Sequence, residues 1–127
     1  MPRATVKLDP EDKVDLKTCP GAFVQLKRLS YGQKLFRQES ISKMTMEMQR
    51  RRGATQKATM EMMQRAATFF DFKMCIHDHN LEDEDGRKLD LSQEKDVTSL
   101  DPKIGEEISD LIDKLNNFEA DAEEGDS

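Results

Sequence analysis

The sequence has 127 residues, of which 36% are charged, and its formal net charge at pH 7 is −6. This length predicts one domain, and Leu, Ile, Val and Phe, which total 26 residues, provide only a modest core. The sequence has no apolar run long enough to span a membrane and does not start with the charged and then apolar residues of a signal peptide, so we expect a cytoplasmic protein. Its two cysteines lack the spacing of a metal site, and we expect both thiols to be reduced.

The charge is divided unevenly along the chain. Residues 1–74 carry 15 Lys and Arg against 8 Asp and Glu, a net charge of +7, whereas residues 75–127 carry 5 against 18, a net charge of −13. The two halves should attract each other, which favours head-to-tail self-association or an acidic surface for a basic partner. The same division argues against nucleic acid as the main ligand of the whole chain.

The N-terminal part predicts a small β element. Residues 4–8 and 14–18 alternate weakly between apolar and polar side chains, with a turn at Asp9-Pro10. A second turn at Pro20-Gly21 precedes residues 22–29, where the alternation is stronger. We therefore expect short strands within residues 4–28.

A first helix is predicted to begin at Tyr31, because Ser30 and Gln33 have the spacing of a capping box. Its apolar residues do not form one stripe, since Tyr31 and Leu35 lie well around the helix from Ile41, Met44 and Met48. Either a break near residues 40–42 or a helix covered on two sides accounts for this pattern.

The run Arg50-Arg51-Arg52 precedes Gly53, and residues 49–54 are predicted to be an exposed loop or a fraying helix end. Several arginines can neutralise phosphates, but no aromatic residues alternate with them, as a platform for single strands requires. Cations near the negative end of a helix dipole are the preferred interpretation.

A second helix is predicted from Thr55 to about Ile76, with two adjacent apolar stripes. Such a wide face can contact two elements at once. We expect one of them to be the C-terminal helix. The other is either the side of the first helix that carries Ile41, Met44 and Met48, or a helix of another protein. Methionine suits surfaces that repack around partners, so the face is either core or a partner groove. The candidate partner-binding residues are Met44, Met48, Met62, Met63, Phe69, Phe70 and Met74.

Phe70 and Met63 are the expected anchors of this groove, because buried aromatic and methionine side chains dominate such contacts. Glu61 and Asp71 are expected at its rim.

A metal site is suggested by His77, His79 and the acidic residues 82–85, but the spacing does not support it. If Gly86 held the sixth position of a calcium loop, Ser92 would stand where the bidentate glutamate is required. A solvated acidic turn is the better interpretation, and no metal or cofactor is expected. Cys75 and His77 lack an orienting third group, so we expect a protein that is not an enzyme.

Asp85-Gly86 predicts a reversal of the chain, followed by the alternating Leu89 and Leu91. Asp101-Pro102 then places a capping carboxylate and a preset φ at the start of a last helix. Its single apolar stripe predicts that this helix docks on the rest of the domain; the stripe contains Ile104, Ile108, Leu111, Ile112, Leu115 and Phe118.

These elements predict a mainly α fold, with a small N-terminal β element and a compact helical domain over residues 1–118 that ends in an amphipathic helix. Residues 119–127 contain five acids and no large apolar side chain. We expect them to form a disordered acidic tail.

Residues 22–118 combine a short β-like start, a helical middle and the segments HNLEDEDGRKLDL, LDPKIGEEI and LNNF. This layout resembles the tail assembly chaperones of long-tailed bacteriophages. The resemblance implies a non-structural protein of the host cytoplasm that coats the helical tape measure protein, recruits tail tube subunits and is absent from the mature virion. It also implies that a longer, frameshifted form carries an extra domain beyond the acidic tail.

Two other classes remain open. A structural connector or minor virion protein would stay in mature particles. A small nucleic-acid-binding regulator would use Arg50, Arg51, Arg52 and Lys57, and its affinity for DNA would fall steeply with salt.

Overall fold

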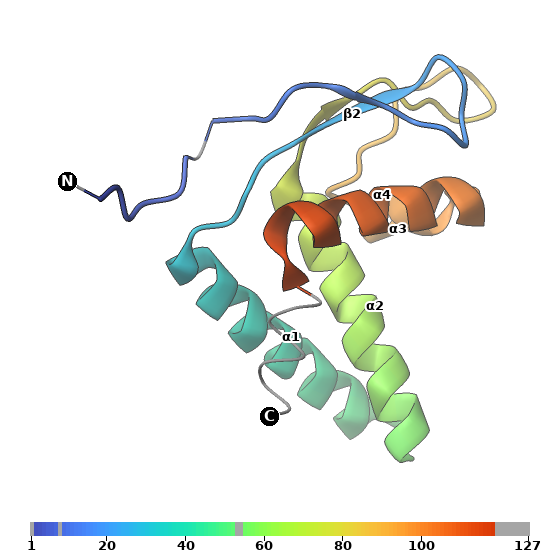
Figure 1. Ribbon diagram of the computed structural model, residues 1–127. Coiled ribbons are helices and arrows are strands. Elements are labelled where there is room, and N and C mark those ends of the chain that lie inside the picture. Colours follow the sequence, from blue (N-terminus) through green and yellow to red (C-terminus); the bar gives the residue numbers. More distant parts are fainter. Residues whose placement is uncertain (1, 8, 53–54, 119–127) are drawn as a thin grey trace.

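The computed structural model describes residues 2–7, 9–52 and 55–118, and it confirms a mainly helical fold with a small antiparallel sheet (Figure 1). The expected acidic tail, residues 119–127, lies outside the described residues. Along the chain the elements are β1 (Val14–Asp15), β2 (Phe23–Leu26), α1 (Tyr31–Arg52), α2 (Gln56–Cys75), β3 (Ile76–His79), α3 (Glu94–Thr98) and α4 (Pro102–Asn116).

The sheet has the strand order β1-β2-β3, and both pairings are antiparallel. The strand predicted within residues 22–29 is confirmed as β2, in which Val24 and Leu26 are buried. The predicted strand at 14–18 is reduced to the two residues of β1. The predicted strand at 4–8 is wrong for residues 4–7, because the chain there has no partner strand.

Helix α1 begins where the capping box predicts. The Ser30 N–H donates to Gln33 Oε1 at 2.9 Å, and the Gln33 N–H donates to Ser30 Oγ at 3.2 Å. The expected break near residues 40–42 is absent, because α1 is continuous to Arg52. Of the two alternatives for residues 49–54, a loop is wrong for residues 49–52, which form the end of this helix. Tyr31 and Leu35 are 77% and 47% exposed, so α1 is not covered on two sides either.

Helices α1 and α2 form an antiparallel hairpin that projects from the sheet (Figure 1). Thr55 caps α2 by accepting a hydrogen bond from the Ala58 N–H at 3.2 Å. Gln49 Nε2 donates to Thr59 Oγ1 at 2.9 Å across the hairpin. The prediction that α2 contacts two elements is confirmed, since it packs against both α1 and α4.

Helix α4 docks as predicted. Asp101 caps it by accepting a hydrogen bond from the Lys103 N–H at 2.9 Å, and Ile108 and Ile112 are completely buried. Glu107, on the other side of α4, accepts hydrogen bonds from the Lys17 and Thr18 N–H groups and the Thr18 hydroxyl. These hydrogen bonds lower the pKa of the Glu107 carboxyl.

The main core lies between the sheet, the last turns of α2 and helix α4. It contains Leu16, Ala22, Val24, Leu26, Leu29, Phe70, Phe72, Cys75, Leu81, Leu89, Leu91, Ile108 and Ile112. The hairpin beyond Phe70 buries only Ile41, Thr45 and Ala66 among its described side chains. The far half of the hairpin is therefore held mainly by contacts between its own two helices. Among the described residues, no helix is long and apolar enough to cross a membrane.

Candidate partner-binding groove

Two neighbouring depressions lie between α1 and α2 and share Phe69 and Glu94. We call them together the hairpin groove. The depression nearer the core has a volume of about 400 Å³ and is lined by Phe36, Ser40, Lys43, Met44, Phe69, Phe70, Lys73, Met74, Ser92 and Glu94. The depression nearer the hairpin loop has a volume of about 540 Å³ and is lined by Met48, Arg51, Ala58, Glu61, Met62, Arg65, Phe69 and Glu94.

Six of the seven candidate partner-binding residues line this groove: Met44, Met48, Met62, Phe69, Phe70 and Met74. The seventh, Met63, is 46% exposed and lines neither depression. Residues of both apolar stripes of α2 therefore share the groove, and Met63 lies outside it.

Phe70 forms the floor of the groove rather than an exposed anchor. It is only 8% exposed, belongs to the main core, and its ring lies 5.8 Å from the Phe36 ring in a tilted arrangement. Phe36 itself is 55% exposed. The two expected anchors, Phe70 and Met63, therefore do not share one surface, and Phe69 at the centre of the groove is the better-placed aromatic side chain.

Asp71 was expected at the rim, and the structure shows that this is wrong. Its side chain is 6% exposed and forms a bidentate ion pair with Arg37, with Arg37 Nε 2.7 Å from Oδ1 and Nη2 3.0 Å from Oδ2. Burial raises the pKa of the Asp71 carboxyl, and the Arg37 guanidinium opposes this shift. The guanidinium also lies 3.9 Å from the centre of the Phe118 ring.

The rim of the groove is mostly basic. Lys43, Arg51, Arg65 and Lys73 line it together with only two carboxylates, Glu61 and Glu94. Lys43 and Arg51 form ion pairs with Glu39 and Glu47 along the exposed side of α1. The Arg65 guanidinium lies 5.5 Å from the Phe69 ring centre. A ligand of this groove thus meets an apolar floor and several cations at its edges.

Sequence reasoning missed Phe36 and Glu94 as groove residues. Phe36 had a detectable signal, because Phe36, Met44 and Met48 are separated by multiples of four residues and so share one side of α1. Glu94 had none. Its position depends on how the chain after β3 returns to the side of α2.

The two histidines of the Cys75–His79 segment differ in burial, and its one cysteine is buried. His77 is exposed, whereas His79 is 8% exposed and its Nδ1 accepts a hydrogen bond from the Leu81 N–H at 3.0 Å. Burial lowers the pKa of His79 and raises the pKa of the completely buried Cys75 thiol to about 12. Among the described residues, no group of three or more His, Cys, Asp and Glu side chains lies close enough together to hold a metal ion.

Comparison of the chain with protein-family models, with curated proteins and with solved structures finds no match.

Proposed function

We propose that this protein is a non-enzymatic tail assembly chaperone of a long-tailed bacteriophage, and that it binds an amphipathic helical segment of the tape measure protein in the hairpin groove. The resemblance of residues 22–118 to that family supports the class. The observation that carries the binding site is that Met44, Met48, Met62 and Phe69 converge on one groove between two helices.

The shape of the groove suits a helix as ligand. Two antiparallel helices leave a long furrow between them, and the apolar side of a third helix fits into such a furrow with its side chains interdigitated. The two depressions lie end to end on either side of Phe69, so that successive apolar side chains of one ligand helix can enter them. The flexible methionines allow different segments of a long client to fit.

The rim selects the charge of the ligand. Arg65 and Lys73, which form no ion pair with a described residue, favour a helix whose apolar stripe is flanked by Asp or Glu, and they disfavour one flanked by Lys or Arg. An exposed amphipathic client in the host cytoplasm would aggregate through its apolar side, so covering that side keeps it soluble. In this proposal tail tube subunits are recruited to the covered client, and a longer, frameshifted form would contribute to this recruitment through its extra domain. The chaperone leaves before the virion is mature.

The test is co-purification of the tape measure protein with groove variants. Phe69→Ala and Met44→Ala should weaken binding by about 2 kcal/mol each, because they remove side chains that the ligand buries. Met63→Ala and Tyr31→Ala are matched controls, since both side chains are exposed and lie outside the groove. Thermal melts should show that all four variants remain folded.

Equal loss of binding in the groove and control variants would contradict the proposal. So would a fall in melting temperature that fully accounts for the loss of binding in the groove variants. Mass spectrometry of purified virions separates this function from that of a minor virion protein, which would be present in them.

A further inference from the structure

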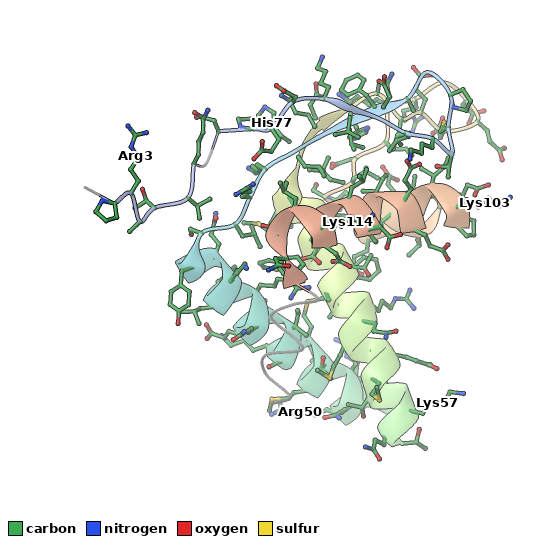
Figure 2. All side chains as sticks on the ribbon, viewed as in Figure 1. Arg3, Arg50, Lys57, His77, Lys103 and Lys114 are labelled. Atoms are coloured by element: carbon green, nitrogen blue, oxygen red, sulfur yellow. The ribbon has the colours of Figure 1, made fainter. Side chains whose placement is uncertain are left out.

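Residues 2–7 form an N-terminal arm that points away from the sheet. Every residue of this arm is exposed, and none of them pairs with a strand. Figure 1 shows the arm extending from the body of the molecule, and Figure 2 shows Arg3 near its free end. The small or apolar residues at 2, 4 and 6 nevertheless alternate with the polar or basic residues at 3, 5 and 7. The arm therefore has the pattern of a strand without a partner strand.

Strand β1 lies at an edge of the sheet, so one of its sides has no neighbouring strand. Hydrogen bonds nearby determine which of its residues point outward. The Leu16 N–H donates to Ala22 O at 2.9 Å, whereas the Phe23 N–H donates to Asn80 Oδ1 at 2.8 Å, on the side away from β1. Asp15 pairs with Phe23, and its own N–H and C=O therefore point out of the sheet.

The open part of this edge is short. The same alternation makes the backbone groups of Lys13 point outward, but farther along the chain the Lys17 N–H donates to the Glu107 carboxylate. Between the two outward-facing residues, the Val14 side chain is 37% exposed, and Val6 of the arm is 39% exposed. Unpaired edge groups beside an exposed apolar side chain are a template for pairing with another strand.

We propose that two copies of this chain exchange their arms, so that residues 2–7 of each copy add as an antiparallel strand to β1 of the other. The exchange pairs Arg3 with Asp15 and Thr5 with Lys13, whose outward backbone groups make the new hydrogen bonds. Arg3 and Asp15 carry opposite charges, and neither forms an ion pair with a described residue of its own chain. Opposite charges directly across two strands stabilise their pairing.

The same register covers apolar side chains that are exposed in the single chain. Ala4 lies opposite Val14, and Val6 lies diagonal to it, within reach across a pair of strands. Val14 itself pairs with the completely buried Val24, so this is the face of the sheet that covers the core. Pro2 is compatible with this register, because its missing N–H falls on the outer side of the added strand.

The linker between the arm and β1 disfavours pairing within one chain. In the same register only residues 8–10 would connect the two strands, and loops of this length use a left-handed residue at their last position. Pro10 occupies that position, and its ring fixes φ at about −65°. Proline also favours an extended conformation at Asp9. A second copy therefore supplies the strand that the arm lacks.

The exchange is reciprocal, since each copy contributes one arm and receives one, and it gives a dimer with two-fold symmetry. Neither the arm nor β1 lines the hairpin groove. The inference is therefore independent of the proposed function.

Two proline substitutions in the arm test the contact without changing the folded core. Thr5→Pro removes an N–H that faces the partner's β1 in this register, whereas Ala4→Pro removes one that faces solvent. Sedimentation velocity of the full wild-type chain should show a concentration-dependent dimer. Thr5→Pro should weaken this dimer at least about tenfold, and Ala4→Pro should leave it close to the wild type.

Charge reversal tests the register. Arg3→Asp and Asp15→Arg should each weaken the dimer about tenfold at roughly 50 mM salt, because each places like charges across the two strands. An equimolar mixture of these variants should form a heterodimer of wild-type strength, and a chain carrying both substitutions should dimerise like the wild type. Lys57→Asp and Asp110→Arg, at exposed helical positions outside the contact, are controls of equal charge change and should dimerise normally.

A pair of cysteines shows which chain supplies the added strand. Ala4→Cys with Val14→Cys, in a chain whose partly exposed Cys19 is replaced by serine, places two thiols where antiparallel strands approach closely. Mild oxidation should give a covalent dimer. A covalent monomer with an internal disulfide would overturn the proposal, because the arm would then pair with its own β1.

A wild type that remains monomeric at all concentrations would overturn the proposal as well. So would a Thr5→Pro dimer of wild-type strength, which would indicate a contact that does not use the arm. Circular dichroism verifies that each variant is folded, and if Asp15→Arg is unfolded, Asp15→Lys replaces it in the mixing experiment.

Discussion

Asn116 joins three segments of the chain through one buried side chain. Its Oδ1 accepts a hydrogen bond from the Leu29 N–H at 2.8 Å, and its Nδ2 donates to Ile112 O at 3.2 Å and to Cys75 Sγ at 3.8 Å. The residue is 4% exposed. The linker between β2 and α1 is thereby tied to the end of α4 and the end of α2, which fixes where the hairpin leaves the sheet.

Asn116→Ala should lower the free energy of unfolding by about 1–3 kcal/mol, because it leaves the buried Leu29 N–H without an acceptor. Asn117→Gly is the matched control. Asn117 is exposed and has a φ of 59°, a conformation that glycine adopts without strain, so this change should be close to neutral. Urea denaturation of both variants measures the difference, and equal effects would show that the buried amide has no special role.

The ion pair of Arg37 and Asp71 connects α1 to α2 at the base of the hairpin, and the Phe118 ring lies against its guanidinium. Asp71→Ala should destabilise the protein by about 3–5 kcal/mol, because it leaves a largely buried guanidinium without its partner. The double variant Arg37→Met with Asp71→Leu should recover most of this loss, since neither buried charge remains. Thermal melts of the single and double variants decide this. A double variant no more stable than Asp71→Ala would contradict it.

Local signals predicted the starts of α1 and α4. The Ser30–Gln33 capping box and Asp101-Pro102 act within a few residues of themselves, and the structure places caps at both. The cap at Thr55 was not identified as such, although the predicted helix began there. Strand β3 could not be predicted in this way. Its residues carry no apolar alternation, and they become a strand because β2, far away in the sequence, pairs with them.

The candidate site, like the fold, could be predicted only where local spacing determines it. Stripes of methionine and phenylalanine follow from helical spacing, which is why six of the seven expected residues share the groove. Burial of Asp71 was not predictable, because it depends on Arg37, which is 34 residues away. Met63 was misplaced for a related reason, since the sequence does not fix which part of the wide face of α2 meets α1.

At the scale of the whole molecule, the main core occupies one end only. The sheet, α4 and the last turns of α2 share it, whereas the other half of the hairpin has few buried side chains. The surface proposed to recognise a partner through methionine, the hairpin groove, extends over this thinly packed half. Recognition is thus placed where the chain can repack without disturbing the core.

From this distribution of packing we expect the hairpin to open locally at a lower free energy than the rest of the fold. Backbone amides of residues 41–52 and 56–63 should exchange with deuterium through partial openings, while those of Ile108 and Ile112 should exchange only on global unfolding. Hydrogen exchange followed by mass spectrometry measures both rates, and uniform protection along α2 would exclude such partial openings. In the proposed function, a client held by a segment that frays on its own would be released step by step, without unfolding of the whole protein.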